Sequence, residues 1–244
     1  MSDALAVNDI RFSYQQTALL KGISFRVPQG GRFAITGRSG CGKSTLLEIC
    51  SSQRTPESGT IEWGGGNIAE LSHDGLVQAR TTIGFVFQRQ ALIHNFTIYD
   101  NIALPLRYHR DMAERDIRAI VKECMDKLGL EGVDRKFPNE CTAAQVSCAA
   151  IARAVVMSPR LLFLDEPTAG VDPVTARGMA DVLLGMNSAS GIAIVMVCNA
   201  PEILKEMNCP VAVLDNGNLY DYKDHARAPQ PGVVDMFSTL RDAL

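Results

Sequence analysis

The chain alternates short apolar runs with longer segments in which apolar residues recur every three or four positions. This pattern predicts an alternation of β-strands and α-helices. Short runs bounded by turn residues predict strands over residues 5–11, 22–27, 32–36, 60–63 and 83–87. Two further runs, 161–164 and 192–197, have no alternating polar positions, and they predict strands that are buried on both faces.

Helical spacing is clearest over residues 113–128, and the pattern also predicts helices over 143–157 and 174–186. The apolar face of the first of these consists of Ile117, Ile120, Val121, Cys124, Met125 and Leu128. Continuous apolar strands that alternate with helices predict an α/β fold with a mainly parallel central sheet. Residues 89–159 contain helical patterns and no strand pattern, which predicts a helical subdomain inserted into that core.

The length and composition limit the class of protein. With 244 residues, of which 46% are hydrophobic and 21% charged, the chain is long enough to bury a large core. Lysine and arginine (24) nearly balance aspartate and glutamate (27), so a basic nucleic-acid-binding protein is not expected. We predict one domain over residues 1–222 and a C-terminal tail over 223–244.

The cysteines, the N-terminus and the length of the apolar runs indicate the cellular compartment in which we expect the protein. There are 7 cysteines, an odd number without a CxxC pair, which is typical of reduced thiols in the cytosol. The N-terminus has no basic segment followed by an apolar one, and no apolar run reaches the ~18 residues of a bilayer span. If the protein works at a membrane, we expect it to dock on another protein there.

A glycine-rich loop follows the predicted strand 32–36 and precedes an apolar helix. It matches the pattern GxxxxGK[ST] in the strand–loop–helix context that makes this pattern meaningful. Successive backbone N–H groups can surround a phosphate, Lys43 supplies a positive charge, and the Ser44 hydroxyl can bind Mg²⁺. The expected nucleotide-binding residues are Gly37, Arg38, Ser39, Gly40, Cys41, Gly42, Lys43, Ser44 and Thr45.

Two carboxylates follow the buried strand 161–164. Asp165 at the strand end can hold the shell of a Mg²⁺ ion, and Glu166 can orient an attacking water molecule. The four histidines have no ligand spacing, so no metal site other than one for Mg²⁺ is expected.

With the phosphate loop, this arrangement resembles the ATP-binding cassette (ABC) ATPases over nearly the whole chain. The resemblance implies a RecA-like core, an N-terminal antiparallel β-subdomain and the helical subdomain. It also implies ATP and Mg²⁺ as cofactors and a second cassette, as in a homodimer, with two ATP molecules between them. Tyr14 then matches the aromatic residue that stacks on adenine, Gln88 the residue that touches Mg²⁺ and the attacking water, and Asp172 the dimer-contacting loop. Asp172 is also a suitable helix cap.

Two elements depart from the family pattern. The signature LSGGQ aligns to residues 141–145, CTAAQ, where the resemblance implies that Thr142, Ala144 and Gln145 contact the ATP of the partner. Alanine replaces both glycines. We expect its Cβ to leave less room for the signature backbone to approach the ATP of the partner, and to penalise positive φ. The switch histidine aligns to Asn199, whose amide can donate a hydrogen bond but cannot carry a charge.

Because Lys43, Ser44, Gln88, Asp165 and Glu166 are intact, we expect ATP and Mg²⁺ binding to survive, while the two departures predict slowed hydrolysis. The expected catalytic residues are Glu166, Gln88 and Asn199, and the expected Mg²⁺ ligands are Ser44, Gln88 and Asp165. A regulatory cassette with vestigial hydrolysis is the alternative from another class. The basic residue that the family has after its signature falls on Cys148.

The stretch 87–109 is similar to the cassette subunits of Mla/MCE lipid-transport systems, as are 172–175 and 184–187. This resemblance implies phospholipid transport through a separate membrane permease with periplasmic lipid-binding partners. The cassette would be peripheral, on the cytoplasmic side of the inner membrane. A lipoprotein-release or small-solute importer cassette is the alternative within transport.

Overall fold

A six-stranded sheet forms the centre of the computed structural model, which describes residues 3–222. Its strand order is β10-β9-β3-β8-β7-β6. Only β10 runs antiparallel to its neighbour. The strands are β3 (Arg32–Thr36), β6 (Ile83–Val86), β7 (Leu161–Asp165), β8 (Ala193–Val197), β9 (Val211–Asp215) and β10 (Asn218–Asp221). The predicted tail 223–244 lies outside the described residues.

The central strands are buried on both faces because a different layer covers each face. Alternate side chains of a strand point to opposite faces, so Leu162 and Leu164 join one core cluster and Leu161 and Phe163 join another. The first cluster packs under α5 (Ala143–Val155), α6 (Pro173–Ser190) and α7 (Pro201–Met207); the second packs against α1 (Lys43–Cys50) and the antiparallel sheet. This two-sided burial explains the unbroken apolar runs.

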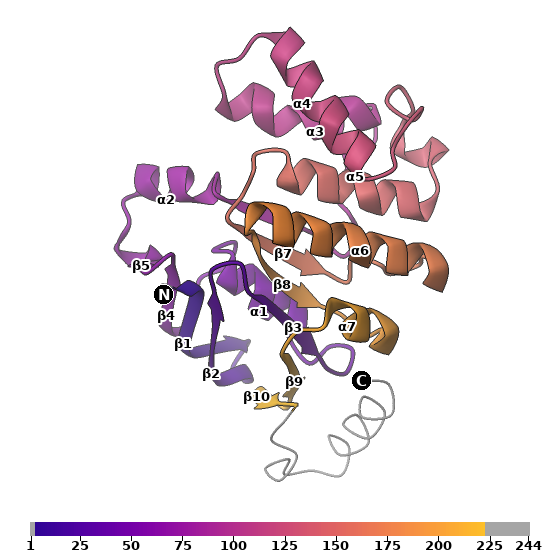
Figure 1. The fold of residues 1–244 in the computed structure, drawn as a ribbon. Helices are drawn as coiled ribbons and strands as arrows, with labels where there is room; N and C mark the ends of the chain where they lie inside the picture. The colour runs from indigo at the N-terminus through magenta and orange to yellow at the C-terminus, as the bar shows by residue number, and fades with distance from the viewer. Residues whose placement is uncertain (1–2, 223–244) are drawn as a thin grey trace.

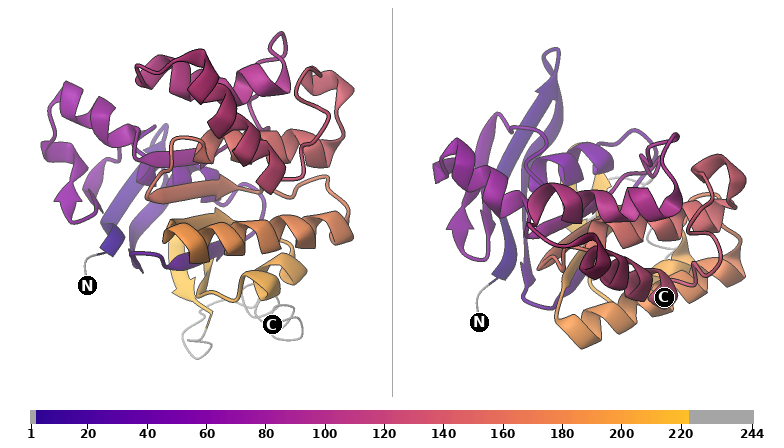
Figure 2. Two further views of the ribbon diagram at one scale, coloured as in Figure 1. Left: turned by 45° about the horizontal axis from the view of Figure 1, so that its top comes forward. Right: turned by 90° about the horizontal axis from the view of Figure 1, so that it is seen from above.

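A second sheet, antiparallel throughout, has the order β2-β1-β4-β5. In Figure 1 it lies on one side of the central sheet, next to α1, and the right-hand view of Figure 2 shows the β1–β2 hairpin extending from the body. Its strands are β1 (Asp3–Tyr14), β2 (Thr17–Pro28), β4 (Ser58–Trp63) and β5 (Gly66–Asn67); the short helices η1 (Ile68–Glu70) and α2 (His73–Arg80) follow.

The helical subdomain contains α3 (Ile98–His109) and α4 (Glu114–Lys127), the short helix η2 (Pro138–Glu140) and then α5. In this subdomain, α3 and α4 lie at the top of Figure 1, away from both sheets, while α5 lies below them and packs against the central sheet. The predicted apolar face of α4 is the one that packs inward, with Ile117, Val121 and Met125 buried. Between residues 89 and 159 the structure contains helices and no strand, although the exact limits of this subdomain stay a prediction.

The α/β fold with an antiparallel subdomain and a helical insertion is therefore confirmed. The strands of the first hairpin are longer than predicted, since β1 and β2 extend well beyond 5–11 and 22–27. The pattern also missed β9, β10 and α7 after residue 200. No helix among residues 3–222 has both the length and the apolar character that a membrane span needs.

Candidate active site

The phosphate loop connects the end of β3 to the start of α1, and two of its glycines cannot carry a side chain. A Cβ on Gly37 would lie 2.4 Å from the Leu214 carbonyl oxygen and 2.9 Å from Cys41 Sγ. Gly42 is the N-cap of α1 with φ of 107°, and a Cβ there would lie 3.0 Å from Leu19 Cγ. The loop conformation therefore depends on glycine at both positions.

Lys43 is the first residue of α1, and its ammonium group is held inside the loop. Nζ donates hydrogen bonds to the backbone carbonyls of Gly37 (2.6 Å) and Arg38 (3.0 Å), and the residue is only 8% exposed. A buried ammonium bound only to neutral carbonyls places a full positive charge beside the helix N-terminus. An anion such as a phosphate group is favoured there.

Asp165 ends β7 deep in the same region. It is 5% exposed, and among the buried side-chain nitrogen and oxygen atoms of residues 3–222 its Oδ1 is the one without a hydrogen-bond partner. Burial raises the pKa of this carboxyl, while the Ser44 hydroxyl and the Lys43 ammonium act in the opposite direction. A buried carboxylate oxygen without a donor, next to a serine hydroxyl, is the donor set that Mg²⁺ prefers, so the residues fit the ion.

Glu166 follows in a left-handed conformation with φ of 47°. Its backbone N–H donates to the Val197 carbonyl (2.9 Å), and the Asn199 N–H donates weakly to its Oε2 (3.4 Å). Burial raises the pKa of Glu166, the Asn199 N–H and Lys43 lower it, and Asp165 adds a smaller increase. A carboxylate made more basic by burial is suited to accept a proton from water.

Asn199 is tied to the start of the phosphate loop. Its Oδ1 accepts hydrogen bonds from the Thr36 hydroxyl (3.0 Å) and the Gly37 backbone N–H (3.3 Å). Because a backbone N–H can only donate, the amide oxygen must face the loop, and the NH₂ group keeps its donors for another partner. Thr36 is 2% exposed, and sequence reasoning did not identify it as part of the site.

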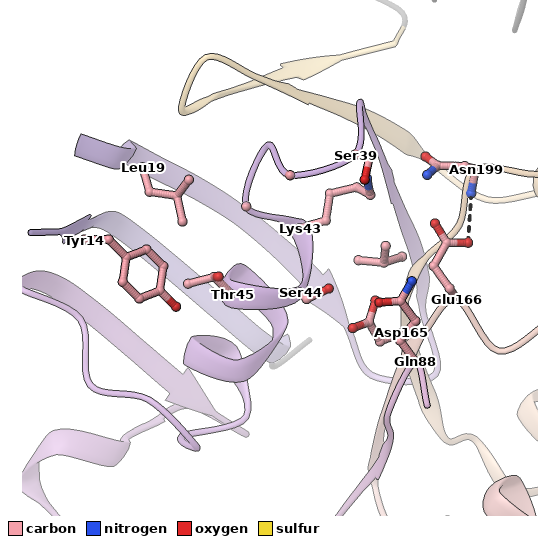
Figure 3. A pocket seen from close by; sticks show the side chains of 13 residues that line it. Tyr14, Leu19, Ser39, Lys43, Ser44, Thr45, Gln88, Asp165, Glu166 and Asn199 are labelled. Carbon is pink, nitrogen blue, oxygen red and sulfur yellow. Dashed lines mark hydrogen bonds between the residues drawn. The ribbon is translucent and has the colours of Figure 1, made fainter. Parts of the chain in front are cut away.

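A cavity of about 290 Å³ gathers most of the predicted residues. Figure 3 shows Tyr14 on one side, the phosphate loop between, and Glu166 and Asn199 on the other. The predicted residues that line it are Tyr14, Ser39, Gly40, Gly42, Lys43, Ser44, Thr45, Gln88, Asp165, Glu166 and Asn199. Val197 and Leu19 also line it; Leu19 was missed because the predicted strand began at 22, although the run 18–20 is apolar.

The remaining loop residues lie beside this cavity. Gly37 holds Lys43 through its carbonyl, while Arg38 and Cys41 line a neighbouring hollow. Tyr14 is 45% exposed, with the Arg54 guanidinium 5.3 Å from its ring centroid and Phe12 edge-on at 5.0 Å. These contacts hold the ring in place, and its stacking on a base stays a prediction.

The signature residues lie at the N-terminus of α5 and do not line this cavity. Thr142 and Gln145 form a capping box: the Gln145 N–H donates to Thr142 Oγ1 (3.2 Å), and the Thr142 N–H donates to Gln145 Oε1 (3.0 Å). Asp172 likewise caps α6, accepting from the N–H groups of Val174 (3.1 Å) and Thr175 (3.0 Å). Their contacts with a partner's nucleotide stay predictions.

One expectation about the signature is wrong. Ala143 and Ala144 are the first residues of α5, and neither has positive φ. Replacing glycine by alanine therefore carries no backbone penalty here, and alanine even favours the helix. Only the space taken by the Cβ atoms remains as a reason for weaker contact between the signature and the ATP of a partner cassette. Cys148, in the position of the family's basic residue, faces the core and is 9% exposed.

The loop before α1 and the two carboxylates at the end of β7 define the class of phosphate-loop nucleotide-binding proteins. The family model described as ABC transporter matches residues 20–169. The chain belongs to the ABC transporter family.

Known relatives and structures agree with this assignment. The methionine import ATP-binding protein MetN of Ralstonia nicotianae is 37% identical over 202 residues, 83% of this chain and 57% of that protein. MetN 1 of Salmonella typhi is 33% identical over 221 residues, 89% of this chain and 64% of that protein. The chain thus spans little more than half the length of these relatives.

Two solved structures have the same fold. The dimeric bacterial ABC transporter cassette MJ0796 superposes with a TM-score of 0.82 at 27% identity, over 88% of this chain and 96% of that one. The cbiO1 protein of Clostridium perfringens, part of the ABC transporter complex cbiONQ, has a TM-score of 0.80 at 30% identity, over 90% and 87%.

Proposed function

We propose that this chain is the ATP-binding and ATP-hydrolysing cassette of an ABC importer for a small solute. The observation that carries the proposal is one pocket in which Lys43, Asp165 and Glu166 converge. A positive charge, a buried carboxylate with one oxygen free of hydrogen-bond donors, and a carboxylate of raised pKa are the parts that phosphoryl transfer to water requires.

Each residue has a distinct task in this proposal. The loop N–H groups and Lys43 bind the phosphates, and Tyr14 supports the base. Glu166 accepts the proton of the attacking water, which Gln88 helps to orient, and the Asn199 amide donates to the terminal phosphate. When bound, Mg²⁺ would be held by Ser44, Gln88 and Asp165 and would neutralise phosphate charge.

The proposed cassette works as one of a pair on a membrane permease, on the cytoplasmic side of the membrane. A surface groove of about 490 Å³ supports this proposal, since it is lined by Phe87, the neighbour of Gln88 in the chain, together with Ile93, Leu104 and Pro105. It lies between β6 and the helical subdomain, where a helix of the permease would transmit its movement to the pocket.

We propose a small solute as cargo because the relatives named above are methionine import proteins. The phospholipid cargo and the periplasmic lipid-binding partners that the stretch 87–109 predicts receive no support from these relatives. The uptake experiment described below distinguishes this lipid cargo from a small solute.

The enzymatic part is tested by the steady-state ATPase rate of the purified chain with its membrane partner, with and without Mg²⁺. We expect slow, Mg²⁺-dependent turnover that Glu166→Gln lowers by about 100-fold or more while ATP binding persists. Glu202→Gln, on the exposed face of α7, is the matched control and should leave the rate unchanged. Equal, negligible rates in wild type and Glu166→Gln would contradict hydrolysis and support a regulatory cassette; rapid turnover would contradict the slowed cycle.

The cargo is tested by uptake of radiolabelled L-methionine in cells of the source organism that carry the same two variants. We expect Glu166→Gln to reduce uptake of this or a similar amino acid and Glu202→Gln to leave it unchanged. Unchanged amino-acid uptake together with an altered phospholipid distribution between membranes would replace the small solute by a lipid.

A further inference from the structure

The segment 87–97 leads from β6 to α3 and contains no regular secondary structure. Two consecutive residues in it, Gln90 (φ 53°) and Ala91 (φ 49°), adopt the left-handed conformation although neither is glycine. Such a conformation costs about 1–2 kcal/mol for each residue. The local hydrogen bonds, from Gln90 N–H to the Phe87 carbonyl (2.8 Å) and from Ala91 N–H to the Arg89 carbonyl (2.5 Å), only close tight turns.

Arg153 from the C-terminal part of α5 holds this turn from outside. Its Nη1 donates to the Ala91 carbonyl (2.7 Å) and its Nη2 to the Gln90 carbonyl (3.0 Å). Among residues 3–222 no carboxylate forms an ion pair with this half-buried guanidinium. Burial lowers its pKa. The two adjacent carbonyls match the fork of the guanidinium, which a lysine cannot reproduce.

Other side chains fasten the same segment to the same subdomain. Gln90 Nε2 donates to the buried Ser147 Oγ of α5 (3.3 Å). Asn101 of α3, which is fully buried, accepts from the Ile93 N–H (2.7 Å). The Asn101 amide also donates to the carbonyls of Ile93, Phe96 and Thr97. The segment is therefore bound to the helical subdomain, although it begins directly after the last residue of a core strand.

Gln88 lies at the junction between the two parts. Its side chain lines the nucleotide pocket beside Asp165, as Figure 3 shows, while the turn that follows it is held by α5. Arg153 also lines the groove between β6 and the helical subdomain, together with Phe87 and Ala91. One side chain thus contacts both the groove and the loop that enters the pocket.

We propose that Arg153 is a positioning residue that ties the strained Gln90–Ala91 turn to α5 and so sets the place of Gln88 in the pocket. This inference rests on the proposed function and names a residue outside the pocket that keeps Gln88 in place for turnover.

The test compares Arg153→Met, Arg153→Lys and the control Arg177→Met, an exposed arginine on α6. We expect Arg153→Met in the complex with the membrane partner to lower kcat about 10- to 100-fold, because displacement of a positioned group by 1 Å has effects of this size. The KM for ATP should change less than about twofold, since the binding residues stay in place. Arg153→Lys, with one hydrogen bond in place of two, should be intermediate.

A second readout separates positioning from general damage. Adding Ala91→Gly to Arg153→Met removes the strain that the arginine opposes, and we expect it to restore part of kcat. Amide hydrogen exchange at Gln90 and Ala91 should accelerate at least about tenfold in Arg153→Met and remain unchanged in Arg177→Met.

The outcomes are separable. Amide hydrogen exchange at residues 90 and 91 that is unchanged in both Arg153 variants would overturn the positioning role of Arg153. An unchanged kcat of these variants in the active complex would also overturn it. Loss of ATP binding in Arg153→Lys would overturn it too, because the defect would then lie in the phosphate loop. A wild-type complex without any ATPase activity would overturn the proposed function instead, while the exchange result would still decide whether Arg153 holds the turn.

Discussion

The phosphate loop, residues 37–42, and the segment 87–97 both contribute residues to the wall of one pocket, and both contain residues with positive φ. In the phosphate loop these residues are Gly37, Gly40 and Gly42, which adopt the conformation without steric cost. In the segment 87–97 they are Gln90 and Ala91, and side chains of the helical subdomain hold them there.

This difference indicates how each loop responds to the rest of the protein. A loop whose shape follows from its own glycines keeps that shape wherever its neighbours move. A loop whose shape depends on Arg153 and Asn101 changes when α3 or α5 moves. The first property suits a fixed phosphate site, and the second suits a loop whose position follows the helical subdomain.

The largest expected effect comes from adding a side chain to the phosphate loop. In Gly37→Ala the Cβ would collide with the Leu214 carbonyl, and the left-handed conformation adds its own cost. We expect a loss of about 2–5 kcal/mol in the free energy of unfolding, measured with urea. Gly40→Ala is the control: nothing lies within 4 Å of its Cβ, so it should lose only about 1 kcal/mol. Equal losses would show that the collision does not matter.

The next effect concerns Asn101, whose side chain holds the segment 87–97 to α3. Asn101→Ala removes one acceptor and two donors from a fully buried site and leaves the Ile93 N–H without its partner. We expect a loss of about 2–3 kcal/mol in the free energy of unfolding. The exposed Asn95→Ala in the same segment should change it by less than about 0.5 kcal/mol. A loss in Asn101→Ala no greater than in Asn95→Ala would contradict external support of this loop.

The smallest effect has the opposite sign. Ala91→Gly relieves the left-handed strain, so we expect the free energy of unfolding to rise by about 0.5–1 kcal/mol. Ala119→Gly, at an exposed position in the middle of α4, should lower it by about 1 kcal/mol. Thermal or urea unfolding of both variants measures the difference. A decrease of equal size in both would mean that the turn at Ala91 is not strained.

Local features were predicted well from the sequence because residue type alone decides them. The glycines and Lys43 of the phosphate loop, the apolar strand before Asp165, and the apolar face of α4 each require only neighbouring residues to be recognised. Two-sided burial left an unbroken apolar pattern in the central strands, and this pattern identified the fold class. Strands β9 and β10 were missed because they follow the last strong motif, although β9 is as long as β7 and β8.

Only the tertiary structure decided what joins these parts. Arg153 and Gln90 are 63 positions apart, and Thr36 and Asn199 are 163 apart, so no local pattern links them. The helical φ of the signature alanines likewise depends on where α5 begins, a boundary set by the cap of Thr142 and Gln145. The sequence by itself determined the nucleotide site because phosphate recognition uses a continuous loop. The structure decided how the helical subdomain reaches that site, because those contacts form between side chains and backbone that only the folded chain brings together.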